Sequence, residues 1–294
     1  MKRLPDSIRR VGLVGNPEKV ATGSVARKAR ALIAAAGRDV LVDAGTAEFV
    51  GLSDARFESV AALAEECDLL IVFGGDGTIL HVARQAAGSG TPILGINLGR
   101  LGFLTASSAA SLGRTLDAVW SGQCHVESRP LIEAAGRGRH GPIHEVALND
   151  FVVSRGMVPR LIELEVKVDR EVLTSYRGDG LIVSSPTGST AYSLAAGGAV
   201  VSPQADVFAL TPICPHTLSN RSVIVSLRST IEVRLLSERV DTFLAADGQT
   251  RAELRAGDSL KVRRSRNTTH LVRLPGSSFF GTLRQKLNWS GSSV

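Results

Sequence analysis

Short apolar runs alternate with helix-patterned segments through the first 120 residues or so of the chain. The run "RRVGLVG" (9–15) precedes apolar positions at helical spacing over 25–36, and "DVLVDAG" (39–45) precedes a second such segment. The run "DLLIVF" (68–73) is apolar without alternation, as in a parallel strand that is covered on both faces. Three more elements complete the series: a helix near 78–87, a strand at 91–97 and a helix near 111–120. This order predicts βαβ units and a doubly wound parallel α/β sheet.

The pattern changes after Gly122. "LIELEVKVD" (161–169) alternates apolar and polar residues without a break, and three later segments are similarly short and β-rich: 221–227, 230–236 and 259–264. Short strands separated by Gly, Pro, Asn and Asp predict an all-β, sandwich-like domain. We therefore expect an N-terminal α/β domain over 1–122 and a C-terminal β-rich domain over 123–273. The tail 274–294 has a weak helical pattern, and we expect it to pack back on the first domain.

Composition and cysteine usage narrow the class of protein. The 294 residues suffice for about two domains, and 44% hydrophobic with 21% charged residues is ordinary for globular proteins. No apolar run reaches the roughly 18 residues of a membrane span, so we expect no membrane association. Three scattered cysteines, Cys67, Cys124 and Cys214, show no C-x-x-C spacing, which argues against a disulfide framework and a zinc knuckle. A cytoplasmic location is expected.

The charge balance favours a small phosphorylated ligand over nucleic acid. The net charge of +6 comes from 34 basic and 28 acidic residues, and most of the basic ones are Arg, which suits bidentate phosphate recognition. The one dense basic run, "KVRRSR" (261–266), has no aromatic residues interleaved with it. We therefore expect no nucleic-acid partner.

The stretch "IVFGGDGTIL" (71–80) places glycines at the end of a predicted strand. Ligands of open α/β sheets bind beyond the carboxyl ends of the strands. Gly74, Gly75 and Gly77 would permit positive φ and a close approach of a ligand, and the next helix N-terminus offers N–H groups to an anion. Asp76 is unexpected there, because a carboxylate repels phosphate. Two readings stay open: a phosphate-tolerant turn with a functional carboxylate, or a structural turn in which Asp76 caps the helix.

Two later stretches also concentrate polar chemistry. "RGDGLIVSSPTGSTAYSLAAGGAVVSP" (177–203) offers hydroxyls, backbone groups and one ring to a sugar and base, and it lacks the G-x-S-x-G of serine hydrolases. A low-complexity turn is the alternative. "ALNDFVVSRG" (147–156) places Asn149 and Asp150 in an apolar context, where they either bind local backbone or hold a ligand. Gly and Pro separate His140 from His144, so we expect no metal site on these histidines.

Six motifs in order along the chain resemble the NAD kinases, which phosphorylate NAD to NADP: "GGDGT", "NLGRLGFL", "LNDFVVSRG", "RGDGLIVSSPTGSTAYSLAAGG", "PHTLSNR" and "DGQ". The resemblance covers nearly the whole chain. Diacylglycerol kinases and sphingosine kinases share "GGDGT", whereas the "GDG…SPTGSTAYSLAAGG" block is much more specific. A lipid kinase of that type and a catalytically silent NAD-sensing module are the alternatives.

The resemblance implies an α/β domain and a β-rich domain with a ligand cleft between them, in a homodimer or homotetramer. It implies NAD and ATP as substrates, with polyphosphate as another possible donor. A divalent cation such as Mg²⁺ would be bound mainly through the donor phosphates, without a dedicated protein metal site.

The resemblance also implies roles for individual residues. Asp76 is the implied general base, and the donor phosphates would meet Gly74, Gly75, Gly77 and Thr78. The implied NAD contacts, besides Asp76 and Gly77, are His81, Phe103, Asn149, Asp150 (where the family more often has Glu), Arg160, Arg177, Asp179, Thr190, Ala191, Tyr192, Ser193, Leu194, Ala195 and Gln249.

Overall fold

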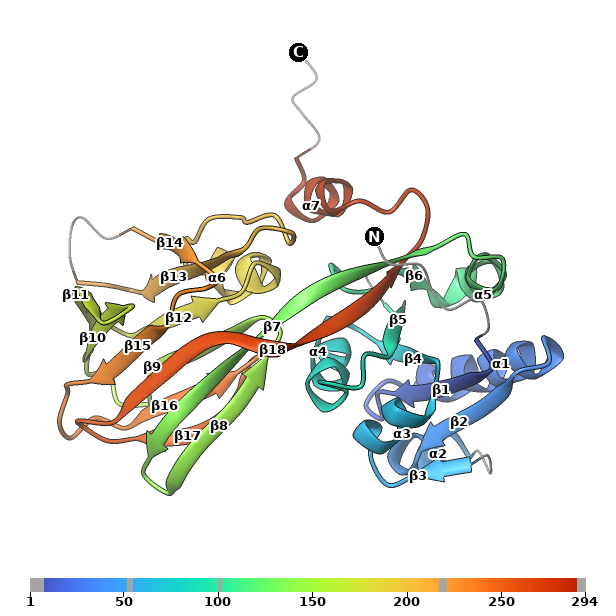
Figure 1. Ribbon diagram of the computed structural model, residues 1–294, viewed down its shortest axis with the longest axis horizontal. Helices are drawn as coiled ribbons and strands as arrows, with labels where there is room; N and C mark the ends of the chain where they lie inside the picture. Colours follow the sequence, from blue (N-terminus) through green and yellow to red (C-terminus); the bar gives the residue numbers. More distant parts are fainter. Residues whose placement is uncertain (1–7, 52–54, 100–101, 217–220, 290–294) are drawn as a thin grey trace, which may run out of the picture. The chain divides into compact units, whose positions relative to one another are not determined.

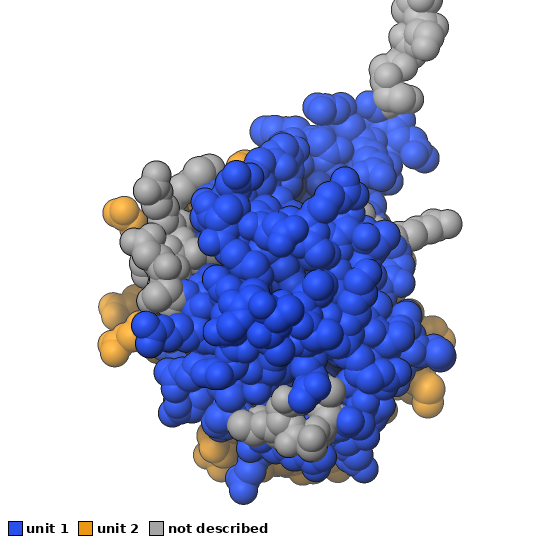
Figure 2. Space-filling model, turned by 90° about the vertical axis from the view of Figure 1, so that its right-hand side faces the viewer, with its two compact units in different colours: residues 1–128, 268–294 blue, residues 129–267 orange. Residues whose placement is uncertain are grey.

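The computed structural model describes residues 8–51, 55–99, 102–216 and 221–289 (Figure 1). The chain divides into two compact units: unit 1 holds Met1–Ser128 and Thr268–Val294, and unit 2 holds Arg129–Asn267 (Figure 2). The sequence predicts boundaries at 122 and 273. Parts of two motifs, residues 100–101 and 217–220, lie outside the described residues.

Unit 1 is built on a parallel sheet with the strand order β3-β2-β1-β4-β5. Its strands are β1 (Arg10–Gly15), β2 (Asp39–Asp43), β3 (Ala55–Phe57), β4 (Leu69–Gly74), β5 (Pro92–Asn97) and β6 (Ser107–Ser108). Its helices are α1 (Ala21–Ala35), α2 (Ala44–Val50), α3 (Val60–Glu66), α4 (Asp76–Gln85), η1 (Ala109–Ser111), α5 (Leu112–Trp120) and α7 (Phe279–Leu287). The predicted βαβ series is confirmed.

Both faces of this sheet are covered, because β4 is buried along its whole length. On one face Ile71 and Phe73 share a core with Ile33 of α1 and Leu116 of α5. On the other face the side chain of Ile79, from α4, packs over the backbone of β5. Burying a side chain of this size stabilises the fold by roughly 1.5 to 3 kcal/mol. The doubly wound arrangement is confirmed.

Unit 2 contains two antiparallel sheets, with the strand orders β11-β10-β15-β18 and β14-β13-β12-β9-β16-β17. Its strands are β7 (His125–Gly138), β8 (Gly141–Ala147), β9 (Asp150–Arg155), β10 (Ile162–Val168), β11 (Glu171–Gly178), β12 (Gly180–Ser184), β13 (Val207–Ile213), β14 (Val223–Ser226), β15 (Ile231–Leu235), β16 (Thr242–Ala246), β17 (Gln249–Leu254) and β18 (Ser259–Arg273). The short helices η2 (Thr187–Thr190) and α6 (Tyr192–Ala195) follow β12. The strands β7 and β18 each have one end in unit 1.

Alternate residues of the two sheets form one core between them. Leu164 and Val166 of β10 lie in the same buried cluster as Phe151 and Val153 of β9. The spacing of two matches the side-chain period of a strand, so the inward residues are the apolar ones. The predicted sandwich-like β domain is confirmed, and with it the predicted fold class.

The C-terminal helix α7 belongs to unit 1. It begins after Ser278, whose hydroxyl accepts a hydrogen bond from Gly281 N at 2.9 Å. The ring of Phe279 lies 6.0 Å from the ring of Phe103, centroid to centroid. Helix α7 therefore contacts the segment that follows β5.

The three cysteines are free thiols. None of the helices in the described ranges has the length and apolar character needed to cross a membrane.

Candidate functional site

The carboxyl ends of β1, β4 and β5 lie side by side in unit 1. Gly15 pairs with Phe73, and Gly74 pairs with Asn97. From β1 the chain proceeds outward to β2, and from β4 it proceeds outward to β5 in the opposite direction. The switch point of the sheet is therefore between β1 and β4, and ligands of open α/β sheets bind at such a point. The glycine loop follows β4 and lies there.

Only Gly74 of this loop serves close packing, and none of the three glycines adopts the positive φ that glycine permits. Gly75 has φ −106° and ψ −169°, and neither Gly74 nor Gly77 has positive φ. A Cβ at Gly74 would overlap the side chain of Thr78. A Cβ at Gly75 or Gly77 would meet nothing within 4 Å. The backbone at these two positions is open to a ligand.

Helix α4 begins at Asp76, two residues before the predicted start. Gly75 is its N-cap residue, and no side chain caps the helix. Asp76 lies in the first turn, where the helix dipole stabilises a carboxylate. The reading in which Asp76 only caps the helix is therefore wrong.

The carboxylate of Asp76 binds the segment that follows β5. Its Oδ2 accepts a hydrogen bond from Phe103 N at 2.8 Å, and its Oδ1 accepts one from Leu104 N at 3.1 Å. A Cβ at Gly102 would overlap this carboxylate, so only glycine permits the approach. Each carboxylate oxygen has a second lone pair, so these bonds orient the group and leave it able to accept a proton.

Arg273 binds the carbonyl groups of the same segment. The sequence did not identify Arg273 as a site residue. Its Nη2 donates to Phe103 O at 2.9 Å, and its Nη1 donates to Leu104 O at 3.4 Å and Thr105 O at 3.3 Å. Its Nε lies 2.9 Å from Glu127 Oε2. The N–H groups of Phe103 and Leu104 are thus bound by the Asp76 carboxylate, and their carbonyl groups are bound by the Arg273 guanidinium. An Arg at the end of an apolar strand, in "LVRLPG", was the available signal.

Three further predicted residues lie in unit 1. Thr78 Oγ1 accepts from Asn16 Nδ2 at 3.3 Å, which joins the loops after β1 and β4. His81 is exposed on α4, with its Nε2 at 2.8 Å from Gln85 Nε2. The half-buried ring of Phe103 contacts α7.

In unit 2, one end of the sheet that contains β9 gathers another set of predicted residues. Asp150 pairs with Ser184 at the end of β12, and Phe151 pairs with Ala246 at the end of β16. The segments that follow these strands carry the residues 187–195 and Gln249. A Cβ at Gly188 would overlap the backbone of Asn149, so the two segments touch there. The structure therefore brings Asn149, Asp150 and Gln249 to the same sheet end as the start of the "PTGSTAY" segment.

The segment 190–195 presents one ring outward. Tyr192 is 47% exposed. Ser193 is buried, and its Oγ lies 2.9 Å from Thr211 Oγ1, which lies 2.9 Å from Ser222 Oγ. The Ser193 hydroxyl anchors the segment to the fold.

The other three predicted contacts lie at the opposite end of the strand. Asp179 is bound by Arg155, the last residue of β9, with Nε 2.5 Å from Oδ1. This guanidinium holds the pKa of Asp179 below its usual value. Arg177 and Arg160 belong to the neighbouring segments, and Arg160 N donates to Val158 O at 2.8 Å. A strand of 6 residues separates the two ends, which is roughly 16 to 20 Å.

Asp150 is only 3% exposed, and its pKa is raised to about 7. Burial is the main cause, because it disfavours the charged form, and the negative charge of Asp247 adds to it. Asp247 is a second residue that the sequence reading missed, although it belongs to the "DGQ" motif.

We expect Asp150 to make the stability of the protein depend on pH. Between about pH 4 and pH 7 the folded state holds a proton that an unfolded Asp has already lost. The contribution of Asp150 to the free energy of unfolding is fully present below about pH 4. It is lost as the pH rises through the folded pKa of Asp150, and the loss is up to about 4 kcal/mol. Urea unfolding at about pH 5 and about pH 8 measures this loss of stability in the wild type. The Asp150→Asn variant, which has no titrating carboxyl at this position, should not show it. An equal pH dependence of the two proteins would contradict the prediction.

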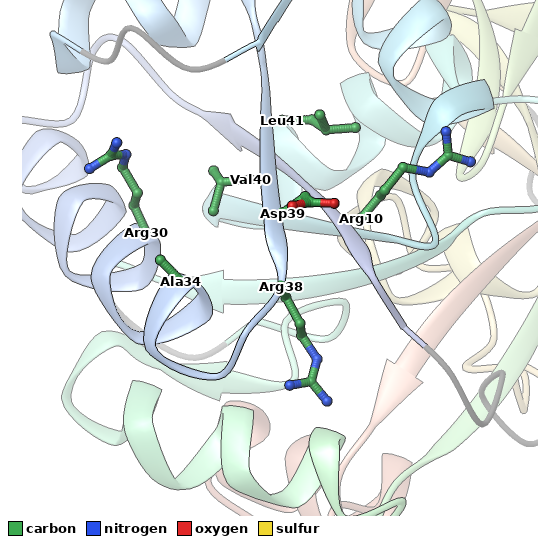
Figure 3. Close-up of a pocket in the computed structure, with 7 residues that line it drawn as sticks. All are labelled: Arg10, Arg30, Ala34, Arg38, Asp39, Val40 and Leu41. Atoms are coloured by element: carbon green, nitrogen blue, oxygen red, sulfur yellow. The ribbon is translucent and has the colours of Figure 1, made fainter.

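A hollow lies at the other end of the sheet in unit 1, away from the glycine loop, and it is not lined by the predicted site residues. It lies at the amino ends of β1 and β2, beside α1, and its lining includes three arginines that point in different directions (Figure 3). Arg10 Nη1 lies 2.8 Å from Glu66 Oε2, and the guanidinium of Arg38 lies 4.0 Å from the ring centroid of Trp120. These side chains serve the fold, and we do not assign the hollow to a ligand.

Comparisons with known proteins match both units. The model of the ATP-NAD kinase N-terminal domain matches residues 11–124, and that of the ATP-NAD kinase C-terminal domain matches residues 148–274. An NAD kinase of Desulforamulus reducens is 41% identical over 94% of this chain and 96% of its own length. An NAD kinase of Syntrophotalea carbinolica is 38% identical over 96% of this chain and 99% of its own length.

Solved structures give the same result. A yeast NADH kinase in complex with NADH matches with a TM-score of 0.89 at 26% identity, covering 98% of this chain and 89% of that one. An NAD kinase from Archaeoglobus fulgidus in complex with ATP matches with a TM-score of 0.74 at 26% identity, covering 96% of this chain and 100% of that one. The resemblance carried by the motifs is confirmed, and the chain belongs to the NAD kinase family.

Proposed function

We propose that this protein transfers the γ-phosphoryl group of ATP to the 2′-hydroxyl of the adenosine ribose of NAD, with Asp76 as the general base. The observation that supports the role of Asp76 most directly is its carboxylate at the switch point of the sheet, fixed by Phe103 N and Leu104 N. The solved relatives in complex with NADH and with ATP support the choice of substrates.

Asp76 acts late in the reaction under this proposal. A carboxylate is too weak a base to remove the proton of a sugar hydroxyl before attack. Phosphoryl transfer generally passes through a loose transition state, so orienting the hydroxyl and accepting its proton as the bond to phosphorus forms are sufficient. The two backbone hydrogen bonds keep the carboxylate in place, which avoids reorganisation during the step. Such assistance is worth about 10² to 10⁴ in rate.

The donor phosphates would lie over the glycine loop, Gly74 to Thr78. The first turn of α4 has backbone N–H groups without intrahelical partners, and these attract an anion. The open backbone of Gly75 and Gly77 lets the phosphates approach. Asp76 then faces the acceptor hydroxyl, while the phosphates meet the N–H groups.

In unit 1, His81 and Phe103 beside the glycine loop would contact NAD. In unit 2, Asn149 and Asp150 would bind the ribose and base, Tyr192 offers a stacking face, and Gln249 adds a polar contact at the same end of the sheet. The remaining residues of 190–195 would contact the dinucleotide chiefly through the backbone. The contacts of Arg160, Arg177 and Asp179 stay a prediction.

A divalent cation, Mg²⁺ by our proposal, fits the chemistry of the loop. In the described ranges no three or more His, Cys, Asp or Glu side chains lie close enough together to hold a metal. Mg²⁺ commonly binds through substrate phosphates with one or two protein oxygens. The cation would be held mainly by the donor phosphates over the glycine loop, while Asp76 faces the acceptor hydroxyl. When bound, the cation neutralises negative charge on the donor phosphates.

An acceptor panel tests the proposal. The purified protein is incubated with γ-labelled ATP and Mg²⁺, and with NAD, NADH or a diacylglycerol dispersion as acceptor. We expect label in NAD and none in lipid. Label in lipid alone would favour a lipid kinase, and protection of the protein by NAD against heat without any transfer would favour an NAD-sensing module. Either result would refute the proposed activity.

We also propose a cytoplasmic homodimer or homotetramer. The location rests on the free cysteines, which suit a reducing compartment. The assembly rests on the family resemblance, and sedimentation of the purified protein measures it.

A further inference from the structure

The turn between β16 and β17 contains a carboxylate that the turn itself does not need. Asp247 has φ 48° and Gly248 has φ 77°, as is usual in a two-residue hairpin turn. Asn and Gly adopt these angles as readily as Asp does. The backbone of the turn therefore accounts for a small polar residue at 247, and a negative charge requires another reason.

That reason is a set of contacts with a segment about one hundred residues earlier in the chain. Asp247 Oδ1 accepts from Asn149 N at 2.7 Å and from Asp150 N at 3.3 Å, and Oδ2 accepts from Leu148 N at 3.1 Å. The backbone N–H of Asp247 in turn donates to Asp150 O at 3.0 Å. One side chain thus collects three successive N–H groups.

The carbonyl side of the same segment is bound by Ser185. Its Oγ donates to Leu148 O at 2.5 Å, and its N–H donates to Asn149 O at 2.8 Å. Gly188 packs against the Asn149 backbone with no space for a Cβ. The backbone of residues 148–150 is therefore bound through both its N–H groups and its carbonyl groups. The position of this backbone determines where the side chains of Asn149 and Asp150 lie.

The charge of Asp247 also acts on Asp150. The backbone of Asp150 pairs with Ser184 of β12, and its N–H donates to the carboxylate of Asp247 from the β16–β17 turn at 3.3 Å. The negative field of Asp247 is the second cause, after burial, that raises the pKa of Asp150. Removing the charge would lower that pKa.

We propose that Asp247 is a positioning residue for NAD recognition: its carboxylate fixes the Asn149–Asp150 segment through the three backbone N–H groups that it binds. This inference rests on the proposed function. Asp247 acts through Asn149 and Asp150, so its loss affects NAD more than ATP.

The variant Asp247→Asn tests the proposal, because Asn keeps the size and the left-handed backbone but replaces one acceptor oxygen by a donor. We expect the KM for NAD to rise about 10- to 100-fold, since a charged acceptor of several backbone N–H groups is removed. The KM for ATP should stay within about threefold, and kcat should fall far less than kcat/KM for NAD. The pH midpoint of kcat/KM for NAD should move to lower pH, because Asp150 loses its charged neighbour.

Asp169→Asn is the matched control. Asp169 has φ 51° and accepts a hydrogen bond from Thr230 N at 2.8 Å, but it lies in the turn between β10 and β11, in the other sheet. We expect its kinetic constants and pH midpoint to match the wild type. A merely structural role of Asp247 predicts a lower melting temperature with both KM values and the pH midpoint unchanged.

The outcomes separate the inference from the function on which it rests. A wild type that forms no NADP refutes the proposed activity. A wild type that forms NADP, with Asp247→Asn unchanged in its KM for NAD and its pH midpoint, refutes the role of Asp247. An equal rise of the KM values for NAD and ATP also refutes it.

Discussion

Replacing Asp76 by Asn should lower kcat for NADP formation by about 10² to 10⁴-fold, with the KM for NAD changed less than about tenfold. The amide retains the volume of the carboxylate and one acceptor oxygen, but it cannot take the proton of the 2′-hydroxyl. One of the two N–H groups, Phe103 N or Leu104 N, loses a full acceptor, which costs about 1 kcal/mol of stability. Steady-state kinetics with saturating ATP measures both constants.

Asp43→Asn is the control for this variant. Asp43 is the N-cap of α2 in the same unit, where its side chain accepts from Thr46 N at 3.2 Å, and Asn caps a helix equally well. We expect wild-type kinetics from it. A kcat of Asp76→Asn within about threefold of the wild type would remove the general base from the mechanism.

Replacing Gly102 by Ala should lower kcat by about 10²-fold, because a displacement of a catalytic group by about 1 Å costs that much. The new Cβ would overlap the Asp76 carboxylate, a short side chain held by two backbone hydrogen bonds. The carboxylate must turn away and lose these bonds, which we expect to lower the free energy of unfolding by about 1 to 3 kcal/mol. Gly102 is not among the residues with positive φ, so backbone strain does not contribute.

Gly113→Ala provides the comparison for Gly102→Ala. Gly113 lies in α5 of the same unit, and a Cβ there meets nothing within 4 Å. We expect unchanged turnover and a stability equal to the wild type or slightly higher, as Ala favours helix. Urea unfolding and kinetics of both variants decide the matter. Normal turnover by Gly102→Ala would show that the packing of Gly102 on Asp76 is unimportant.

The sequence pattern predicted the elements that carry the site, because their apolar periods are local. The unbroken apolar run 68–73 corresponds to the buried β4, and the alternating run 161–169 corresponds to β10. The predicted start of α4 was two residues too late, since a Gly-Asp-Gly sequence is a poor helix signal.

The residues that hold the site could not be read from the sequence. Arg273 binds the carbonyl of Phe103, 170 positions away, and Asp247 binds the N–H of Asn149, 98 positions away. Neither contact has a local period, and each depends on which strand ends meet in the sheet. The resemblance implies NAD contacts at both Asp150 and Asp179, whereas the structure places these residues at opposite ends of neighbouring strands.

The identity of the phosphorylated product tests the central claim most directly. The wild type is incubated with NAD, ATP and Mg²⁺, and the product is analysed by ³¹P NMR and by reduction with a dehydrogenase that accepts only NADP. We predict one new phosphomonoester on NAD that this dehydrogenase reduces, in amounts equal to the ADP formed, and at least about 10²-fold less of it with Asp76→Asn over the same time. ADP release without phosphorylated NAD, or an equal yield from Asp76→Asn, would contradict phosphorylation of NAD by Asp76-assisted transfer.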